Sequence, residues 1–401
     1  ASLILYFFNP FRMSQHKLFL NLILSSFILL SGCIEEYFPD DEVLKTGTLV
    51  VQAHLNNKPG EQTLVISRSS TLIYPEFDAF SGCHVEVLNK DGDSREFKES
   101  EPGIYIFIHY DNFFRSNEEY RLIFVTPAGK QYESEFERLH PVSEINSIYY
   151  NQENHSTSDP DQIEEGVQFY MDFEIEKESG RYLRWQVTET YEIHNPEYDA
   201  LIFDLDYQMK ELPDSSSWRT CWITLNIPEI FTLDLKDVEG ETFKKMPLNY
   251  VNTETRRLNI RYSILVEQLA LSQSAFQYWN EQAKTSQSGG SLFDSQPALS
   301  PGNICNVDNE NELVIGFFSV SGLTEERVFI ENVPGLKTQY NPTYCMPGEY
   351  PKYLNYFRPE YLPVYLGLAW VDGARSYGEV HKYCVDCREY KGSSNVIPDF
   401  W

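Results

Sequence analysis

Residues 48–67 read Thr48-Leu-Val-Val-Gln-Ala-His-Leu-Asn-Asn-Lys-Pro-Gly-Glu-Gln-Thr-Leu-Val-Ile-Ser67, and this stretch decides the fold class. An apolar, β-branched run over residues 48–54 is followed by turn residues at 56–60, and residues 62–67 then alternate between apolar and polar side chains. Alternation with a period of two is typical of a half-buried strand, and Pro-Gly is typical of a turn between strands. The stretch therefore predicts a β-hairpin.

The same strand–turn–strand pattern continues to about residue 140. Residues 83–87 alternate strictly, with Cys83 on the apolar face, and residues 120–126 and 131–136 flank a short Pro-Ala-Gly-Lys loop. About seven short strands at such close spacing are typical of an immunoglobulin-like sandwich. We therefore expect an Ig-like β-sandwich over residues 47–140.

The rest of the chain, residues 141–401, predicts a larger β-rich domain. Further strands are expected from the apolar or alternating runs at residues 167–175, 182–193, 313–320, 327–331 and 361–370. One helix stands out from Ser272, which can cap its N-terminus, to about Lys284. The predicted fold class is thus mainly β: an N-terminal Ig-like β-sandwich followed by a larger β-rich domain with one or a few helices.

The N-terminus has the layout of a bacterial lipoprotein signal. Lys17 precedes an apolar run over residues 18–30, which ends in Ser31-Gly32-Cys33. A transmembrane helix needs about 20 apolar residues, and this run is too short. The pattern predicts a signal peptide over residues 1–32, of which residues 1–12 are interpreted as upstream sequence because Met13 is a natural start. We expect Cys33 to carry the lipid and residues 33–46 to form an acidic tether.

The charge of the chain excludes one class of partner. It has 60 Asp and Glu against 32 Lys and Arg residues, a formal net charge of −28, which repels nucleic-acid phosphates. A lipid anchor would hold the chain at the membrane while its body stays in water. Glu35 and Glu36 directly follow Cys33 and resemble the surface-export signal of Bacteroidota lipoproteins; the alternative is a merely solvated tether. We expect the body to face the cell exterior.

The chain has seven cysteines, of which six remain if Cys33 is lipidated. An exported chain crosses an oxidising compartment, so disulfides are expected, while Cys83 also fits a buried thiol. The candidates for disulfides are Cys221, Cys305, Cys345, Cys384 and Cys387. Their pairing is open. A bond from Cys384 or Cys387 to Cys345 or Cys221 would tie the C-terminal segment to the body.

The C-terminal cysteines also allow a metal or redox interpretation. His381, Cys384 and Cys387 spell His-x-x-Cys-x-x-Cys, three potential zinc ligands, but no fourth ligand has diagnostic spacing. A thioredoxin-like site would need a βαβ setting, which the strand pattern here does not supply. We therefore expect structural disulfides and no metal.

No motif in the sequence specifies a reaction. A Gly-x-Ser-x-Gly elbow, a phosphate-binding Gly-rich loop, a His-Glu-x-x-His helix and a dinucleotide fingerprint are all absent from it. Residues 308–312 resemble a calcium loop, but Leu313 stands where glycine is required. We predict no enzyme activity, no catalytic residues and no cofactor. The 27 Tyr and 26 Phe residues favour strands, with a surface for glycans or peptides as the alternative.

Several stretches, taken together in order and spacing, resemble the Bacteroidota lipoproteins of domain of unknown function 4249. They are Leu49-Val50-Val51, Ser67-Arg68-Ser69, Cys221-Trp222, Leu271-Ser272, Tyr278-Trp279, residues 290–294, Pro301-Gly302-Asn303-Ile304, residues 316–321, residues 384–388 and Pro398-Asp399-Phe400-Trp401. Cys83 and Cys305 are departures from the family pattern. The resemblance implies an outer-membrane lipoprotein, commonly encoded beside a TonB-dependent receptor, and it implies no catalytic residues.

On this basis we expect a surface-exposed, lipid-anchored and non-catalytic accessory subunit of a TonB-dependent barrel, which captures or gates a ligand in nutrient uptake. Two alternatives stay open. One is a structural subunit of an outer-membrane biogenesis or secretion complex. The other is a free-standing glycan- or peptide-binding module.

Overall fold

The computed structural model describes residues 47–70, 76–156, 163–195, 200–204, 206, 208–211, 217–238, 242–287, 302–338, 345–348, 362–371 and 374–401. The signal peptide, the tether, Cys33, Glu35 and Glu36 therefore lie outside the described residues. Among the helices that are described, none has the length and apolar character needed to span a membrane.

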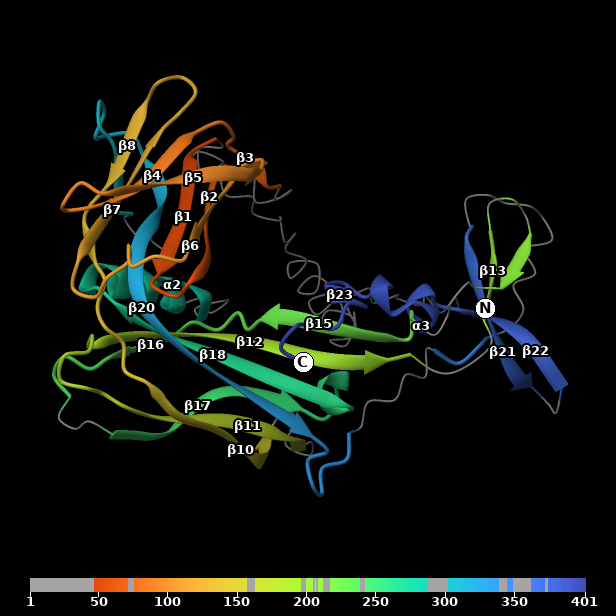
Figure 1. Cartoon of the computed structure of the whole chain (residues 1–401). Coiled ribbons are helices and arrows are strands. Elements are labelled where there is room, and N and C mark those ends of the chain that lie inside the picture. The colour runs from red at the N-terminus through yellow and green to blue at the C-terminus, as the bar shows by residue number, and fades with distance from the viewer. Residues whose placement is uncertain are drawn as a thin grey trace, which may run out of the picture. The chain divides into compact units, whose positions relative to one another are not determined.

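The predicted N-terminal strands form a sheet around a core of their own (Figure 1). They are β1 (Leu49–Asn56), β2 (Gly60–Arg68), β3 (Asp78–Ala79), β4 (His84–Asn89), β5 (Ser94–Glu101), β6 (Ile104–His109), β7 (Glu119–Val125), β8 (Gln131–Ser134) and β9 (Glu137–Arg138). All pair antiparallel with one another, and their alternation buries residues such as Val51, Val85 and Val87. The prediction of a mainly β fold is confirmed.

Two strands from much later in the chain complete this first core. β19 (Ile304–Asn306) pairs with β8, and β20 (Val314–Glu331) runs parallel to β1. Phe318 and Val320 on β20 are buried among the N-terminal strands. Gly316 has φ +108°, and a Cβ there would lie 1.9 Å from the Val51 carbonyl oxygen, so only glycine fits this close approach. The range predicted for the sandwich, 47–140, did not include these strands.

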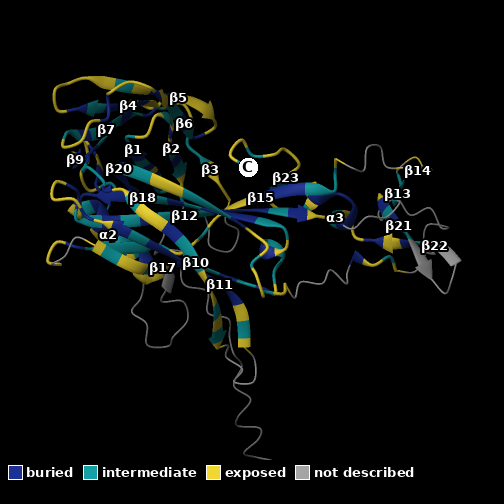
Figure 2. Cartoon of the chain, turned by 60° about the horizontal axis from the view of Figure 1, so that its bottom comes forward, coloured by how far each residue is buried: buried dark blue, intermediate teal, exposed yellow. Residues whose placement is uncertain are grey.

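A second core lies between two further groups of strands (Figure 1). One group is the three-stranded sheet of β10 (Ile145–Ser156), β11 (Ile163–Glu174) and β17 (Thr242–Asn252). The other comprises β12 (Tyr182–His194), β15 (Thr220–Asn226), β16 (Phe231–Asp234) and β18 (Arg261–Leu271), joined by the far half of β20. Phe169, Phe173 and Trp185 are among its fully buried side chains. Figure 2 shows buried positions interspersed with more exposed ones along these strands, as expected for strands with one face in the core.

The helix α2 (Gln273–Gln287) begins as the sequence predicts. The Ser272 hydroxyl accepts a hydrogen bond from the Ala275 amide at 3.1 Å, which caps the helix. Ser272 and Ser274 also donate to the buried carboxylate of Glu137, which Asn303 contacts at 3.3 Å. Burial raises the pKa of Glu137 more than its hydrogen bonds with Ser272, Ser274 and Asn303 lower it. This network joins the helix start to the first core.

The remaining elements build the C-terminal part of the chain. β14 (Met209–Glu211), β13 (Ala200–Phe203), β21 (Val364–Val371) and β22 (Ala374–Val380) form a four-stranded sheet in that order. It is followed by the short helix α3 (Lys382–Val385), the 3-10 helix η5 (Cys387–Glu389) and β23 (Ser393–Ser394), which pairs with β15. A further 3-10 turn, η1 (Arg256–Leu258), precedes β18.

Candidate functional site

Two disulfides hold the C-terminal segment. Cys221 in β15 bonds to Cys387 in η5, with a Cα–Cα distance of 5.8 Å, and Cys345 bonds to Cys384 in α3, with a Cα–Cα distance of 5.4 Å. The two neighbouring cysteines of the Cys-x-x-Cys motif therefore bond to two different distant partners. We call residues 381–395 with these two bonds the C-terminal staple.

Cys305 is a correction to the predicted disulfide set, because its thiol is free and exposed. In β19 the inward positions are Ile304 and Asn306, so Cys305 points outward beside β8, where its sulfur lies 3.7 Å from the Glu133 carbonyl oxygen. Cys83 is also free and half-buried against the first core. Its amide donates to the Tyr105 hydroxyl at 2.9 Å, and burial raises the pKa of its thiol.

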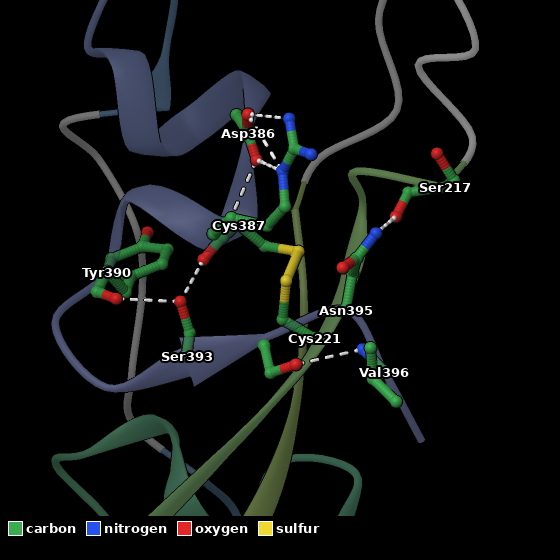
Figure 3. The surroundings of a disulfide bond; sticks show 10 residues. Ser217, Cys221, Asp386, Cys387, Tyr390, Ser393, Asn395 and Val396 are labelled. Carbon is green, nitrogen blue, oxygen red and sulfur yellow. Dashed lines mark hydrogen bonds and ion pairs between the residues drawn. A yellow bond between two sulfur atoms is a disulfide. The ribbon is translucent and has the colours of Figure 1, made fainter. Parts of the chain in front are cut away.

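Hydrogen bonds around Cys387 fix the staple in position (Figure 3). The buried Asp386 carboxylate accepts the Arg388 amide at 3.0 Å and also binds the Arg388 guanidinium at 2.7 Å. That guanidinium lies over the Trp218 ring at 4.4 Å, and the Cys387 amide donates to the Trp218 carbonyl at 2.8 Å. The Ser393 hydroxyl donates to the Cys387 carbonyl at 2.6 Å. The short turns are thus held by side chains as well as by the disulfide.

A pocket of about 350 Å³ lies beside the staple. It is lined by Pro363, Val364, Tyr365, Glu379, Val380, His381, Lys382 and Glu389. The β21–β22 pair supplies one side, where Tyr365 lies opposite Val380 in register. The first residues of α3 and the last residue of η5 supply the other. Both disulfides therefore restrain the wall of the pocket, because Cys384 lies in α3 and Cys387 lies in η5.

Charged groups gather at the mouth of this pocket. Lys382 Nζ lies 2.5 Å from a Glu389 carboxylate oxygen, and this contact raises the pKa of Lys382. The pKa of Tyr365 is raised first by burial and then by the negative charges of Glu389 and Asp386. His381 stacks against the Tyr383 ring with 3.8 Å between centroids. The pocket thus combines an apolar, aromatic floor with a rim of mixed charge.

Both cysteines of the zinc-like motif are oxidised, so in this structure they staple the fold rather than offer thiolates to a metal. Within the part of the chain that the structure describes, no group of three or more His, Cys, Asp or Glu side chains is placed to hold a metal ion. No sequence motif predicted the pocket, although the run Glu379-Val380-His381-Lys382 beside the cysteines was a usable signal.

Comparisons with known proteins give one family, and the solved structures that match include two remote ones. A family model described as "Domain of unknown function (DUF4249)" matches residues 34–327. No curated protein matches the chain. A segment of two fibronectin type III domains from chicken tenascin is 13% identical, with 56% of this chain and 90% of that chain covered, at a TM-score of 0.16.

Trypsin-activated alpha-2-macroglobulin from Escherichia coli is 8% identical, with 57% of this chain and 15% of that chain covered, at a TM-score of 0.18. Neither TM-score is high enough to transfer anything from those structures. The pocket residues, 363–389, lie beyond the residues that the family model matches.

Proposed function

Because the chain belongs to the DUF4249 family, whose model matches residues 34–327, we propose that it is a surface-exposed outer-membrane lipoprotein and a non-catalytic accessory subunit of a TonB-dependent receptor. In this role it captures or gates a ligand for uptake through the barrel. Cys33 carries the lipid, and Glu35 and Glu36 direct export to the cell surface.

The observation that carries this proposal is the pair of disulfides in the C-terminal staple. Disulfides form and persist in oxidising compartments, which supports a chain that leaves the cytoplasm, in accord with the lipoprotein signal at Ser31-Gly32-Cys33. One of the two bonds joins cysteines in β15 and η5 that are 166 residues apart, so it ties the pocket region to the second core.

Ligand capture is supported by the position of the pocket. Its walls come from a hairpin and two short turns that the disulfides hold together, so the site is built before a ligand arrives. A site that is already ordered loses less conformational entropy on binding. A lipid anchor at Cys33 would keep this site at the membrane while the body stays in water.

A mild-detergent purification of the lipidated protein from its native membrane, with mass spectrometry of the co-purified proteins, tests the proposal. A stoichiometric TonB-dependent barrel is the expected result. Barrel-assembly or secretion subunits in its place would make the chain a structural subunit, and a protein recovered alone would favour a free-standing binding module. A tagged lipoprotein without this domain, isolated from the same membrane, controls for unspecific capture.

A further inference from the structure

The sheet of β10, β11 and β17 carries aromatic rings on the face that points away from the second core (Figure 1). In the register of β10 with β11, Tyr149 lies opposite Tyr170, and their sequence neighbours Ile148 and Phe169 are buried in that core. Successive side chains of a strand point to opposite faces, so both tyrosines and, further along β10, His155 lie on the outer face. We call this surface the tyrosine face; it is formed by Tyr149, Asn151, Glu153, His155, Tyr170 and Tyr250.

At one end of the tyrosine face, two rings lie along the sheet. The Tyr149 hydroxyl donates to the Asp172 carboxylate at 3.1 Å, and the Tyr170 hydroxyl donates to the Glu153 carboxylate at 2.5 Å. Because each hydroxyl is bound by the neighbouring strand, its ring is drawn along the sheet, and the two ring centroids are 5.9 Å apart. Tyr170 is 7% exposed, with Lys245 Nζ 4.8 Å from its centroid, so the half-exposed Tyr149 is the ring that a ligand can reach.

At the other end, the ring of Tyr250 lies across Gly166. A Cβ on Gly166 would come within 2.6 Å of Cζ and of the hydroxyl oxygen of Tyr250, so the glycine lets this ring lie on the sheet. The Tyr250 hydroxyl donates to the Glu164 carbonyl at 2.8 Å. The His155 ring stacks on Tyr250 with 3.8 Å between centroids and 13° between planes, and 41% of its side chain is exposed. His155 therefore presents a second flat ring to solvent.

Polar groups lie between and beside these rings. Side chains on one face of a strand recur about every 7 Å, so Tyr149 and His155 are about 20 Å apart along β10. The exposed amide of Asn151 lies between them. Glu164 lies opposite His155, and Asp172 receives the Tyr149 hydroxyl. Among the described residues neither carboxylate forms an ion pair, so both have lone pairs left to accept hydrogen bonds from a ligand.

These features together favour a neutral sugar chain as the ligand. The C–H face of a sugar ring is attracted by the negative face of an aromatic ring, and sugar hydroxyls donate to carboxylates and exchange hydrogen bonds with an amide. The carboxylates of Glu153, Glu164 and Asp172 repel acidic sugars and anionic headgroups. The core of a protein–protein interface is depleted in charged residues, which argues against a protein partner here. A peptide strand would add to a sheet edge, where backbone groups are free, rather than to a face.

We propose that the tyrosine face binds a neutral oligosaccharide. One sugar unit stacks on Tyr149 and another on His155, and the units between them form hydrogen bonds with Asn151 and the carboxylates beside it. This binding goes beyond the proposed function, since it gives the protein a second binding surface and needs no partner barrel.

Calorimetric titration of the full-length, lipidated protein tests the proposal, in a polyoxyethylene detergent because that detergent has no sugar headgroup. The neutral probes are maltohexaose, cellohexaose and laminarihexaose, and hexagalacturonate is the acidic counterpart. We expect saturable one-to-one binding of at least one neutral hexasaccharide and no binding of hexagalacturonate. The disaccharide of the series that binds should be at least about tenfold weaker, because it is too short to reach both rings.

Three outcomes of this titration would overturn the proposal. They are no binding of any of the three neutral hexasaccharides, equal affinity for a hexasaccharide and its disaccharide, and binding of hexagalacturonate at least as tight as that of the neutral probes.

Variants of single rings place the ligand on this face. Tyr149→Ala should weaken binding of the neutral hexasaccharide about tenfold, whereas Tyr149→Phe, which keeps the ring, should keep the affinity within about threefold. His155→Ala, at the other end of the face, should also weaken binding about tenfold. Tyr110→Ala is the matched control, because Tyr110 is 81% exposed and follows β6 in the sheet of the first core, and it should leave binding unchanged. Urea midpoints of the variants separate a lost contact from a lost fold.

An unchanged affinity in both Tyr149→Ala and His155→Ala, or the same loss in Tyr110→Ala, would refute the assignment of the site. A protein partner that is lost from the membrane purification of Tyr149→Ala, with no sugar bound by the wild type, would make this face a protein contact instead. The titration uses the protein alone, so it can succeed or fail whichever partner the membrane purification returns.

Discussion

Removal of the Cys221–Cys387 disulfide should destabilise the protein more than removal of Cys345–Cys384. All four cysteines are at most 4% exposed, so each pair is best replaced by alanine, which leaves no buried hydroxyl without a partner. The two double variants, C221A/C387A and C345A/C384A, then differ mainly in the loop that the missing bond had closed. Cys221 and Cys387 are 166 residues apart and Cys345 and Cys384 are 39 apart.

The magnitude follows from the entropy of the unfolded chain. A cross-link over 166 residues stabilises by about 5 kcal/mol and one over 39 residues by about 4 kcal/mol at 25 °C in the chain-entropy account. Measured losses usually fall at about 2–4 kcal/mol. The constant part of the estimate cancels between the two variants, so we expect C221A/C387A to be less stable than C345A/C384A by about 1 kcal/mol.

Urea unfolding of the two variants and the wild type, followed by tryptophan fluorescence, measures this difference as a shift of midpoint at constant slope. Reductant should lower the midpoint of the wild type below that of either variant. Equal losses in the two variants, or a larger loss in C345A/C384A, would refute loop closure as the main contribution of these bonds.

Three further results are expected. Gly316→Ala should lower the free energy of unfolding by more than about 3 kcal/mol, because φ is +108° and the new Cβ would meet the Val51 carbonyl oxygen at 1.9 Å. Gly92→Ala, at φ +92° with open space around it, should lower it by only about 1–2 kcal/mol. Equal urea midpoints for the two variants would contradict this expectation. Glu137 has a raised pKa in the folded state. Its contribution to the free energy of unfolding is therefore complete below its ordinary pKa of 4.5, and it is lost as pH rises through the raised value. The stability of the wild type relative to Glu137→Gln should therefore fall from about pH 4.5 upward, and a difference that is flat with pH would count against a raised pKa. Cys33→Ser should move the protein from the membrane to the soluble fraction, and retention in the membrane would show that the lipoprotein signal was misread.

Local patterns in the sequence predicted the parts of the fold that local interactions determine. The alternation of Val85 and Val87 placed both side chains in the first core, and Ser272 was identified as the cap of the helix that follows it. The apolar run that contains Phe318 was identified as a strand. Its parallel partner β1 was missed, because no local signal encodes which of many strands lies next to it.

Long-range pairing also explains what the sequence could not show of the site. The sequence leaves the pairing of Cys384 and Cys387 open, because which bond each forms depends on the sheet that carries Cys221. Cys305 is a disulfide candidate in the sequence only because an exported chain crosses an oxidising compartment, and the neighbouring residues do not reveal that it faces outward in β19. Asn306 is polar yet points inward at 1% exposure, where its amide donates to Glu312 at 2.7 Å. The apolar–polar pattern therefore gave no guide to the outward face.

The parallel pairing of β1 with β20 determines how early the first core can form while the chain is being made. His54 on β1 and Ser319 on β20 lie 2.9 Å apart although 265 residues separate them. The first core cannot close before most of the chain has left the ribosome, and contacts between such distant residues form slowly. A chain exported as we propose must be threaded through a narrow translocation channel before it folds. The late arrival of β20 leaves the N-terminal strands without their final partner until residues 314–331 have been made.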